Sequence, residues 1–182
     1  TTTDAENLTA IGYNATATDA DAGETVTFAL SGGADLAKFS LAAGVLTFVG
    51  APDFETPTDT GSNNTYVVDI TATGGAQTAV QTVTVTVTDE SDNAPVFTSG
   101  TTATVAENLT AIGYTATATD ADAGETVTFA LSGGADLAKF SLAAGVLSFV
   151  GAPDFETHTD TGSNNTYVVD ITATGGTQTA VQ

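Results

Sequence analysis

The chain of 182 residues contains one long internal repeat with a period of 101 residues. Segment 5–81 recurs as segment 106–182, and only four of its 77 positions differ: Asn14/Thr115, Thr47/Ser148, Pro57/His158 and Ala76/Thr177. Self-similarity at a fixed period indicates one folding unit used twice. We therefore expect two domains with the same fold and the same role, which argues against an active site in one copy only.

Each copy has the pattern of an antiparallel β-sandwich. The clearest strand is Thr82–Thr88, where three valines alternate with threonines. Period 2 places the valines in a core and the threonines outside. Ala42-Ala43-Gly44 predicts a hairpin turn in which the glycine adopts positive φ. A short helical turn is predicted at Asp35–Lys38. The other predicted strands are 11–18, 25–30, 39–41, 45–49 and 66–73, with a first strand near 101–105. This gives about seven short strands per copy, the number expected of a sandwich.

The second copy stops at Gln182, which aligns with Gln81. It therefore lacks the counterpart of the valine-rich strand, and a sandwich without its last strand exposes an open edge. Two interpretations remain: the sequence is part of a longer secreted array, or another chain supplies the strand.

Composition narrows the classes of partner. The chain has 2 Lys+Arg and 22 Asp+Glu, a formal net charge of −20, which argues against nucleic acid and anionic membranes and favours divalent cations. It has no Cys, so disulfides and thiolate metal sites are excluded. No apolar run is long enough to insert into a bilayer. These features predict an extracellular or cell-surface location.

Acidic residues gather in four motifs. Ala-Glu-Asn, Asp-Ala-Asp-Ala-Gly-Glu and Asp-Phe-Glu occur in both copies, and Asp-Glu-Ser-Asp-Asn-Ala-Pro-Val-Phe occurs once, at 89–97. Hard oxygen donors without imidazole or thiolate suit Ca²⁺. An EF-hand is excluded because Gly124 is fifth and Leu131 twelfth in its loop. A solvated, Asp-rich hinge is the alternative interpretation of each motif alone.

In order and spacing, these motifs resemble the extracellular cadherin repeat in its bacterial cadherin-like form. The resemblance covers essentially the whole chain. It implies an all-β fold of two tandem Greek-key β-sandwiches, with the second lacking its last strand. It also implies that calcium is held between consecutive repeats. The implied domains are 1–97, the first repeat with its calcium linker, and 98–182, the second repeat truncated before its final strand.

The resemblance also implies the calcium ligands. The outermost ion would take Glu6, Asp53, Glu55 and Asp92. The middle ion would take Glu6, Glu55, Asp89, Asp92, Asp122 and the Glu90 carbonyl. A third would take Asp120, Asp122, Ser91, the Asn93 carbonyl and the Thr126 carbonyl. Ser91 stands where the family usually has Asn, and Gly175 where it usually has Asp, so two ions are expected and the third position is weakened.

Electrostatics supports a cation at this joint independently. Seven carboxylates would gather there, and neighbouring like charges about 4 Å apart repel by roughly 4 kcal/mol at an effective dielectric of about 20. The remaining acidic residues would be half-sites for further repeats. Asp19 and Asp21 would complete an upstream site, and Glu107, Asp154 and Glu156 a downstream one.

The predicted function is structural: calcium-rigidified extender repeats of a large secreted or cell-surface adhesin or extracellular fibre. The partners would be neighbouring repeats of the same or an identical chain. The rival interpretation is a calcium-dependent module for homophilic adhesion or polysaccharide binding, the latter through the polar loop Thr56–Thr65. An enzyme is not expected, since the single histidine, His158, is replaced by Pro57 in the first copy.

Overall fold

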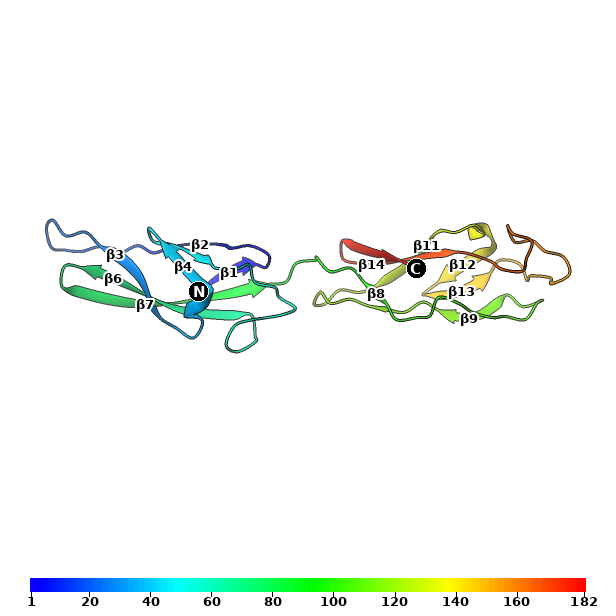
Figure 1. Ribbon diagram of the computed structural model, residues 1–182, viewed down its shortest axis with the longest axis horizontal. Helices are drawn as coiled ribbons and strands as arrows, with labels where there is room; N and C mark the ends of the chain where they lie inside the picture. Colours follow the sequence, from blue (N-terminus) through cyan, green and yellow to red (C-terminus); the bar gives the residue numbers. More distant parts are fainter. The chain divides into compact units, whose positions relative to one another are not determined.

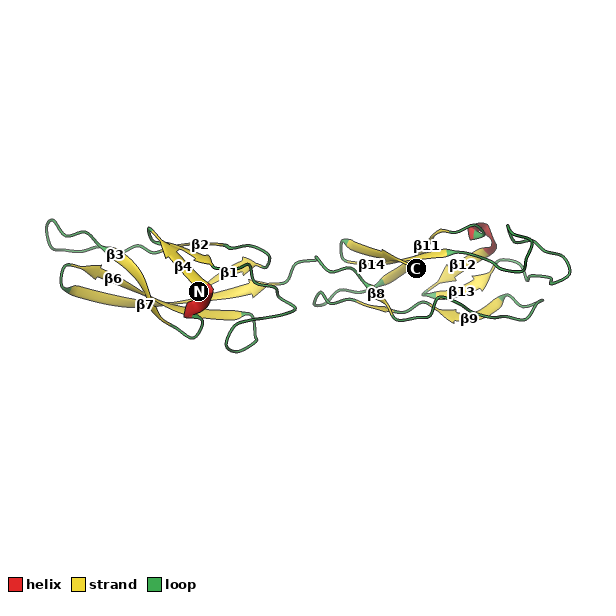
Figure 2. Ribbon diagram, in the orientation of Figure 1, coloured by secondary structure: helices red, strands yellow, loops and turns green.

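The computed structural model describes all 182 residues and divides the chain into two compact units, Thr1–Glu90 and Ser91–Gln182. Each unit consists of β-strands and one short 3₁₀ turn, without any α-helix (Figures 1 and 2). No helix in the chain has the length and apolar character needed to cross a membrane. The all-β sandwich predicted from the sequence is confirmed for both units.

The first unit is built from two sheets. One sheet has the strand order β1-β7-β6-β3 and the other has the order β2-β5-β4. Its elements are β1 (Thr2–Ala5), β2 (Ala10–Asn14), β3 (Thr27–Gly32), η1 (Leu36–Lys38), β4 (Phe39–Ala42), β5 (Val45–Phe48), β6 (Thr65–Gly74) and β7 (Gln77–Thr88). β1 pairs with β7 in parallel, whereas the other pairs are antiparallel.

Alternation along β7 builds the core of this unit. Val83, Val85 and Val87 are almost completely buried, as predicted, and Val85 lies opposite Tyr66 in β6. The Tyr66 ring meets Phe48 edge-on at 5.2 Å between centroids, and Phe48 stacks on Phe39. The two sheets are thus joined through an aromatic cluster, an arrangement that adds to simple area burial.

The predicted hairpin between β4 and β5 is confirmed. Its two connecting residues, Ala43 and Gly44, both have positive φ. Such a two-residue turn matches the right-handed twist of the flanking strands. The predicted helical turn at Asp35–Lys38 is confirmed as η1.

The second unit repeats this plan with fewer paired residues. Its three sheets are β11-β14-β15, β12-β13-β9 and β10-β8. The elements are β8 (Val96–Phe97), β9 (Ala111–Thr115), β10 (Ala118–Thr119), β11 (Thr128–Gly133), η2 (Leu137–Lys139), β12 (Phe140–Ala143), β13 (Val146–Phe149), β14 (Asp170–Gly175) and β15 (Gln178–Val181). The aromatic cluster of Phe140, Phe149 and Tyr167 is retained.

One strand prediction is wrong in the second unit. The segment near Thr101–Val105 does not form a strand, although its counterpart forms β1 in the first unit. The reason is the missing partner, because β1 pairs only with Val85–Thr88 of β7. β14 is also shorter than β6, since residues 166–169 lack the strand that pairs with 65–68.

The two units differ in how closely their cores are packed, and this leads to a prediction about their stability. Leu46 is fully buried, whereas its counterpart Leu147 borders an open cavity. Leu46→Ala should destabilise its unit by about 2–5 kcal/mol, because a closed core cannot collapse onto the lost atoms. Leu147→Ala should cost clearly less. Native-state hydrogen exchange of core amides in the whole chain measures both, and equal destabilisation of the two units would contradict the expectation.

Candidate metal centres

Three carboxylates converge at one end of the first unit. Glu6, Asp53 and Glu55 each offer an oxygen, and these oxygens lie within 4.8 Å of one another. Glu6 is 2 % exposed, and its two carboxylate oxygens accept hydrogen bonds from the backbone N–H groups of Phe54 (2.7 Å) and Glu90 (2.9 Å). These two hydrogen bonds hold the segments at Phe54 and Glu90 against the Glu6 carboxylate.

Asp89 adds a fourth carboxyl to this group. It shares a side-chain hydrogen bond with Glu55. Burial, this hydrogen bond and repulsion from Glu6 and Asp89 together raise the pKa of Glu55 to about 7. Two carboxyl groups in contact require a shared proton or a bound cation, because two like charges at this range disfavour the ionised form of both. The predicted ligands of the first unit are therefore brought together by the fold.

The second unit holds another group near its start. Asp120, Asp122 and Glu125 offer oxygens that again lie within 4.8 Å of one another. Asn93 binds Asp122 twice, through its backbone N–H (3.1 Å) and its side-chain amide (2.8 Å). The same amide donates to Asp92. One oxygen of Asp120 and one of Glu125 are buried without a hydrogen-bond partner, so the group has acceptor capacity to spare.

Ser91 is tied to the turn between β14 and β15. Its hydroxyl oxygen accepts the Thr177 N–H (2.9 Å), and its carbonyl accepts the Thr177 hydroxyl. Thr177 is one of the four positions at which the copies differ. In the adjoining Gly175, a Cβ would collide with the Asp120 carboxylate. The glycine at this position thus gives Asp120 its place in the group.

Two further acidic groups lie at the remaining predicted positions. Glu107, Asp154 and Glu156 form an exposed group in the second unit, where the Phe155 N–H donates to Glu107. Asp19 and Asp21 form an exposed group in the first unit together with Glu24. Glu24 and Glu125 are additions to the predicted ligands. They end the Asp-Ala-Asp-Ala-Gly-Glu motif, so the sequence contained the signal.

Four buried carboxylates have a structural role instead. Burial opposes ionisation of Asp35, but hydrogen bonds from Val67 and Thr60 outweigh it and lower its pKa. The Val168 hydrogen bond lowers the pKa of Asp136 in the same way, against burial. Asp59 accepts from the N–H groups of Gly61, Asn63 and Asn64, and Asp160 organises the equivalent loop. None of these four residues is among the predicted metal ligands, and their structural role was not predicted from the sequence.

Hydrogen bonds within the loop Thr56–Thr65 count against the polysaccharide-binding alternative, because they occupy donors that a sugar would need. The loop Thr56–Thr65 uses its amides internally: Asn64 donates its side-chain amide to the Phe54 carbonyl, and Thr60 donates to Asp35. Phe54 is partly buried and packs against the core. His158 is exposed in the corresponding loop of the second unit.

Solved structures show which known fold this is. Human protocadherin-24 repeats EC1-2 match with a TM-score of 0.72 and 20 % identity over 99 % of this chain and 87 % of theirs. The protocadherin gammaB4 extracellular domain matches with 0.70 and 26 % over 100 % of this chain and 29 % of that one. Mouse cadherin-23 EC22-24 matches with 0.70 and 21 % over 99 % and 60 %. The chain therefore has the fold of cadherin ectodomain repeats.

The similarity to known proteins is weaker in sequence than in fold. No protein-family model and no curated protein matches it.

The raised pKa of Glu55 predicts that the stability of the metal-free chain falls as the pH rises towards 7. A group whose folded pKa is raised from 4.5 to about 7 stabilises the fold below about pH 4.5, and this stabilisation is lost as the pH rises towards 7. The melting temperature of the first unit should therefore fall between pH 5 and pH 7.5. In Glu55→Gln the fall should be smaller, because the amide does not titrate. Calorimetry tests this, and an equal fall in both proteins would contradict the assignment.

Proposed function

We propose that this chain is a calcium-rigidified structural extender. It would form two cadherin-like repeats of a large secreted or cell-surface protein, either a bacterial adhesin or an extracellular fibre. Residues 1–97 would be the first repeat with its calcium linker, and 98–182 the second repeat. Neighbouring repeats of the same or an identical chain would be its partners, and it would perform no catalysis.

The crowding of Glu6, Glu55 and Asp89 is the observation that carries this proposal. Glu6 is held in place by two backbone N–H groups, and Glu55 shares a hydrogen bond with Asp89. If these carboxyl groups moved apart, the hydrogen bonds that order the end of the unit would break. A divalent cation offsets the repulsion without disturbing them, and carboxylate oxygens are the ligands that Ca²⁺ prefers.

Chain connectivity supports ions shared by the two units. Asp89 lies in the first acidic group, and Asp92 is linked through the Asn93 side-chain amide to Asp122 of the second. Three extended residues span at most about 10 Å, so the two groups are tethered at short range. Ions bound by both groups would fix the angle between the repeats. We propose two ions in such a joint, with a third position weakened because Ser91 is engaged by Thr177.

Calcium sites of this kind would suit an extracellular location. Calcium sites of extracellular modules have dissociation constants of about 10⁻⁴–10⁻³ M. The repeats would be stiff at such concentrations and flexible when calcium is removed. The exposed groups at Asp19–Asp21 and at Glu107, Asp154 and Glu156 would serve joints with further repeats.

Calorimetric titration of the whole chain with Ca²⁺ tests the ligand assignment. We expect at least two sites, and Asp92→Ala should lose one site or weaken it at least tenfold, about 1.4 kcal/mol. The effect should be large because Asp92 is a proposed ligand of two ions.

A matched control separates ligation from net charge. Asp170→Asn also removes one negative charge, but Asp170 lies in β14 outside the acidic groups. It should leave the number of sites unchanged and the affinities within about threefold. A wild-type titration curve from Asp92→Ala would refute the assignment.

A further inference from the structure

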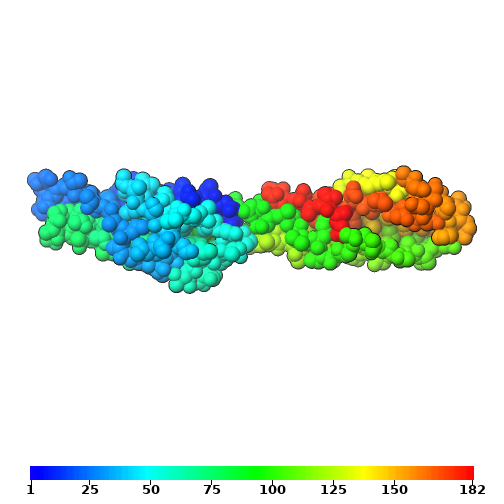
Figure 3. All heavy atoms as spheres, in the orientation of Figure 1, coloured from blue at the N-terminus to red at the C-terminus, as the bar shows by residue number.

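The linker segment, residues 91–97, is attached to the second unit by packing and hydrogen bonds between protein groups. At its downstream end, Val96 and Phe97 pair with β10. The Phe97 ring lies 6.0 Å from the ring of Phe129, and both pack against the core of this unit. Pro95 is buried. Figure 3 shows this segment in green beside the red C-terminal residues of the same unit. The linker is therefore part of the second unit.

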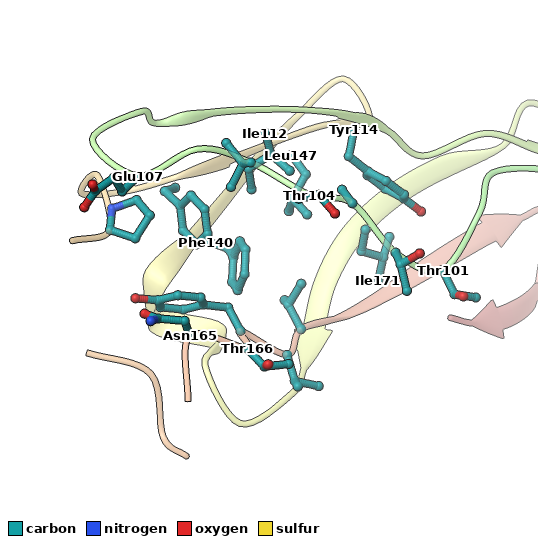
Figure 4. A pocket seen from close by; sticks show the side chains of 18 of the residues that line it. Thr101, Thr104, Glu107, Ile112, Tyr114, Phe140, Leu147, Asn165, Thr166 and Ile171 are labelled. Atoms are coloured by element: carbon teal, nitrogen blue, oxygen red, sulfur yellow. The ribbon is translucent and has the colours of Figure 1, made fainter. Parts of the chain in front are cut away.

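The chain remains attached beyond the linker. The Thr98 N–H donates to the Thr117 carbonyl (2.8 Å), and the hydroxyl oxygens of Ser99 and Tyr114 lie 3.0 Å apart. Figure 4 shows Tyr114 on the same side of the cavity in this unit as Thr101, to which the segment leads. A rotation of the linker would have to break these contacts or begin upstream of them.

The upstream end of the linker is held by the turn between β14 and β15. The Thr177 N–H donates to the Ser91 hydroxyl oxygen (2.9 Å), and the two hydroxyl oxygens lie 3.2 Å apart. The Ser91 carbonyl accepts from the Thr177 hydroxyl and from the Gln178 side-chain amide, each at 3.3 Å. Gly176 makes this approach possible, because a Cβ there would collide with the Ser91 hydroxyl. Ser91 is thus fixed to the second unit without an ion.

The hydroxyl in this turn is specific to the second copy. The counterpart of Thr177 is Ala76, whereas the residues on either side of it are the same in both copies. Two of the contacts with Ser91 use the Thr177 hydroxyl, which can donate one hydrogen bond and accept another. An alanine would make neither contact. The difference between the copies therefore adds a connection between this turn and its linker.

One residue upstream, the chain is held by the first unit. The Glu90 N–H donates to the Glu6 carboxylate (2.9 Å), and the Glu6 N–H donates to the Thr88 carbonyl (3.1 Å). The attachments to the two units are therefore adjacent in the chain, and the boundary between the units falls between Glu90 and Ser91. Because peptide bonds are planar, the backbone between the two attachments turns only about the φ and ψ angles of these two residues.

We propose that Thr177 is a positioning residue that holds the linker on the second repeat in the absence of calcium. Movement of the calcium-free chain is thereby confined to Glu90–Ser91. Asn93 stays bonded to Asp122 while no ion is present, so this part of the joint is ordered before calcium binds. The consequence for calcium binding rests on the proposed function, whereas the attachment of the linker does not.

NMR relaxation of the whole chain in EDTA tests the proposal. Segment 89–97 occurs once in the sequence, so its signals are distinct from those of the repeated segments. The backbone order parameter of Ser91 should be about 0.85, the value of a rigid backbone. In Thr177→Val, which has the same shape without the hydroxyl, it should fall below about 0.7, towards the range of flexible backbone. Phe97 should stay rigid in both proteins.

Two variants provide matched controls. Thr177→Ser keeps the hydroxyl and should leave the order parameter of Ser91 at the wild-type value. Thr179→Val makes the same chemical change in β15, where Thr179 pairs with Thr174, and should also leave it unchanged.

The proposal is overturned if Ser91 is flexible in the calcium-free wild-type chain or if Thr177→Val leaves its order parameter unchanged. It is also overturned if either control variant lowers the order parameter as much as Thr177→Val does. Because these measurements are made in EDTA, they are independent of whether the chain binds calcium. A wild-type chain that binds no calcium would refute the proposed function and leave the result for the linker standing.

Discussion

Repulsion between carboxylates that the backbone holds at short range is the constraint on which the ends of these units depend. Glu6 is fixed by the N–H groups of Phe54 and Glu90, and Glu55 is held against Asp89, so the charges cannot relax by moving apart without loss of these hydrogen bonds. Burial, the hydrogen bond with Asp89 and this repulsion together raise the pKa of Glu55, so a proton relieves the repulsion in part. A divalent cation bound by these oxygens would relieve it more completely, because carboxylate oxygens are the ligands that Ca²⁺ prefers.

The two copies together isolate the contribution of one strand. With β7 in place, Tyr66 and Val68 are sealed, β1 forms, and β6 extends over ten residues. Without its counterpart, the same residues flank a cavity and two segments lose their pairing, although the aromatic cluster and the remaining sheets persist. The sandwich core is therefore formed by the central strands, and the last strand closes it.

Sequence reasoning succeeded where the physical cause was local. The alternation of valines in Thr82–Thr88 placed them in the core, and Gly44 marked a turn that needs positive φ. It failed where partners are distant. Asp35 bonds to Val67 and Thr60, which lie 32 and 25 residues away, so its structural role was invisible. The strand expected near Thr101–Val105 depended on a partner that the second unit lacks. Gly175 suggested only a lost ligand, whereas the fold uses it to make room for Asp120.

The proposed function requires that calcium bound by the acidic groups of both units fixes the joint between them. Small-angle X-ray scattering of the chain in millimolar calcium and after addition of EDTA tests it most directly. We expect chelation to change the maximum dimension and to broaden the distance distribution, and calcium to restore both. A chain with Asp89→Asn and Asp92→Asn should give the chelated profile in either condition. Scattering profiles that are unchanged by chelation would contradict it.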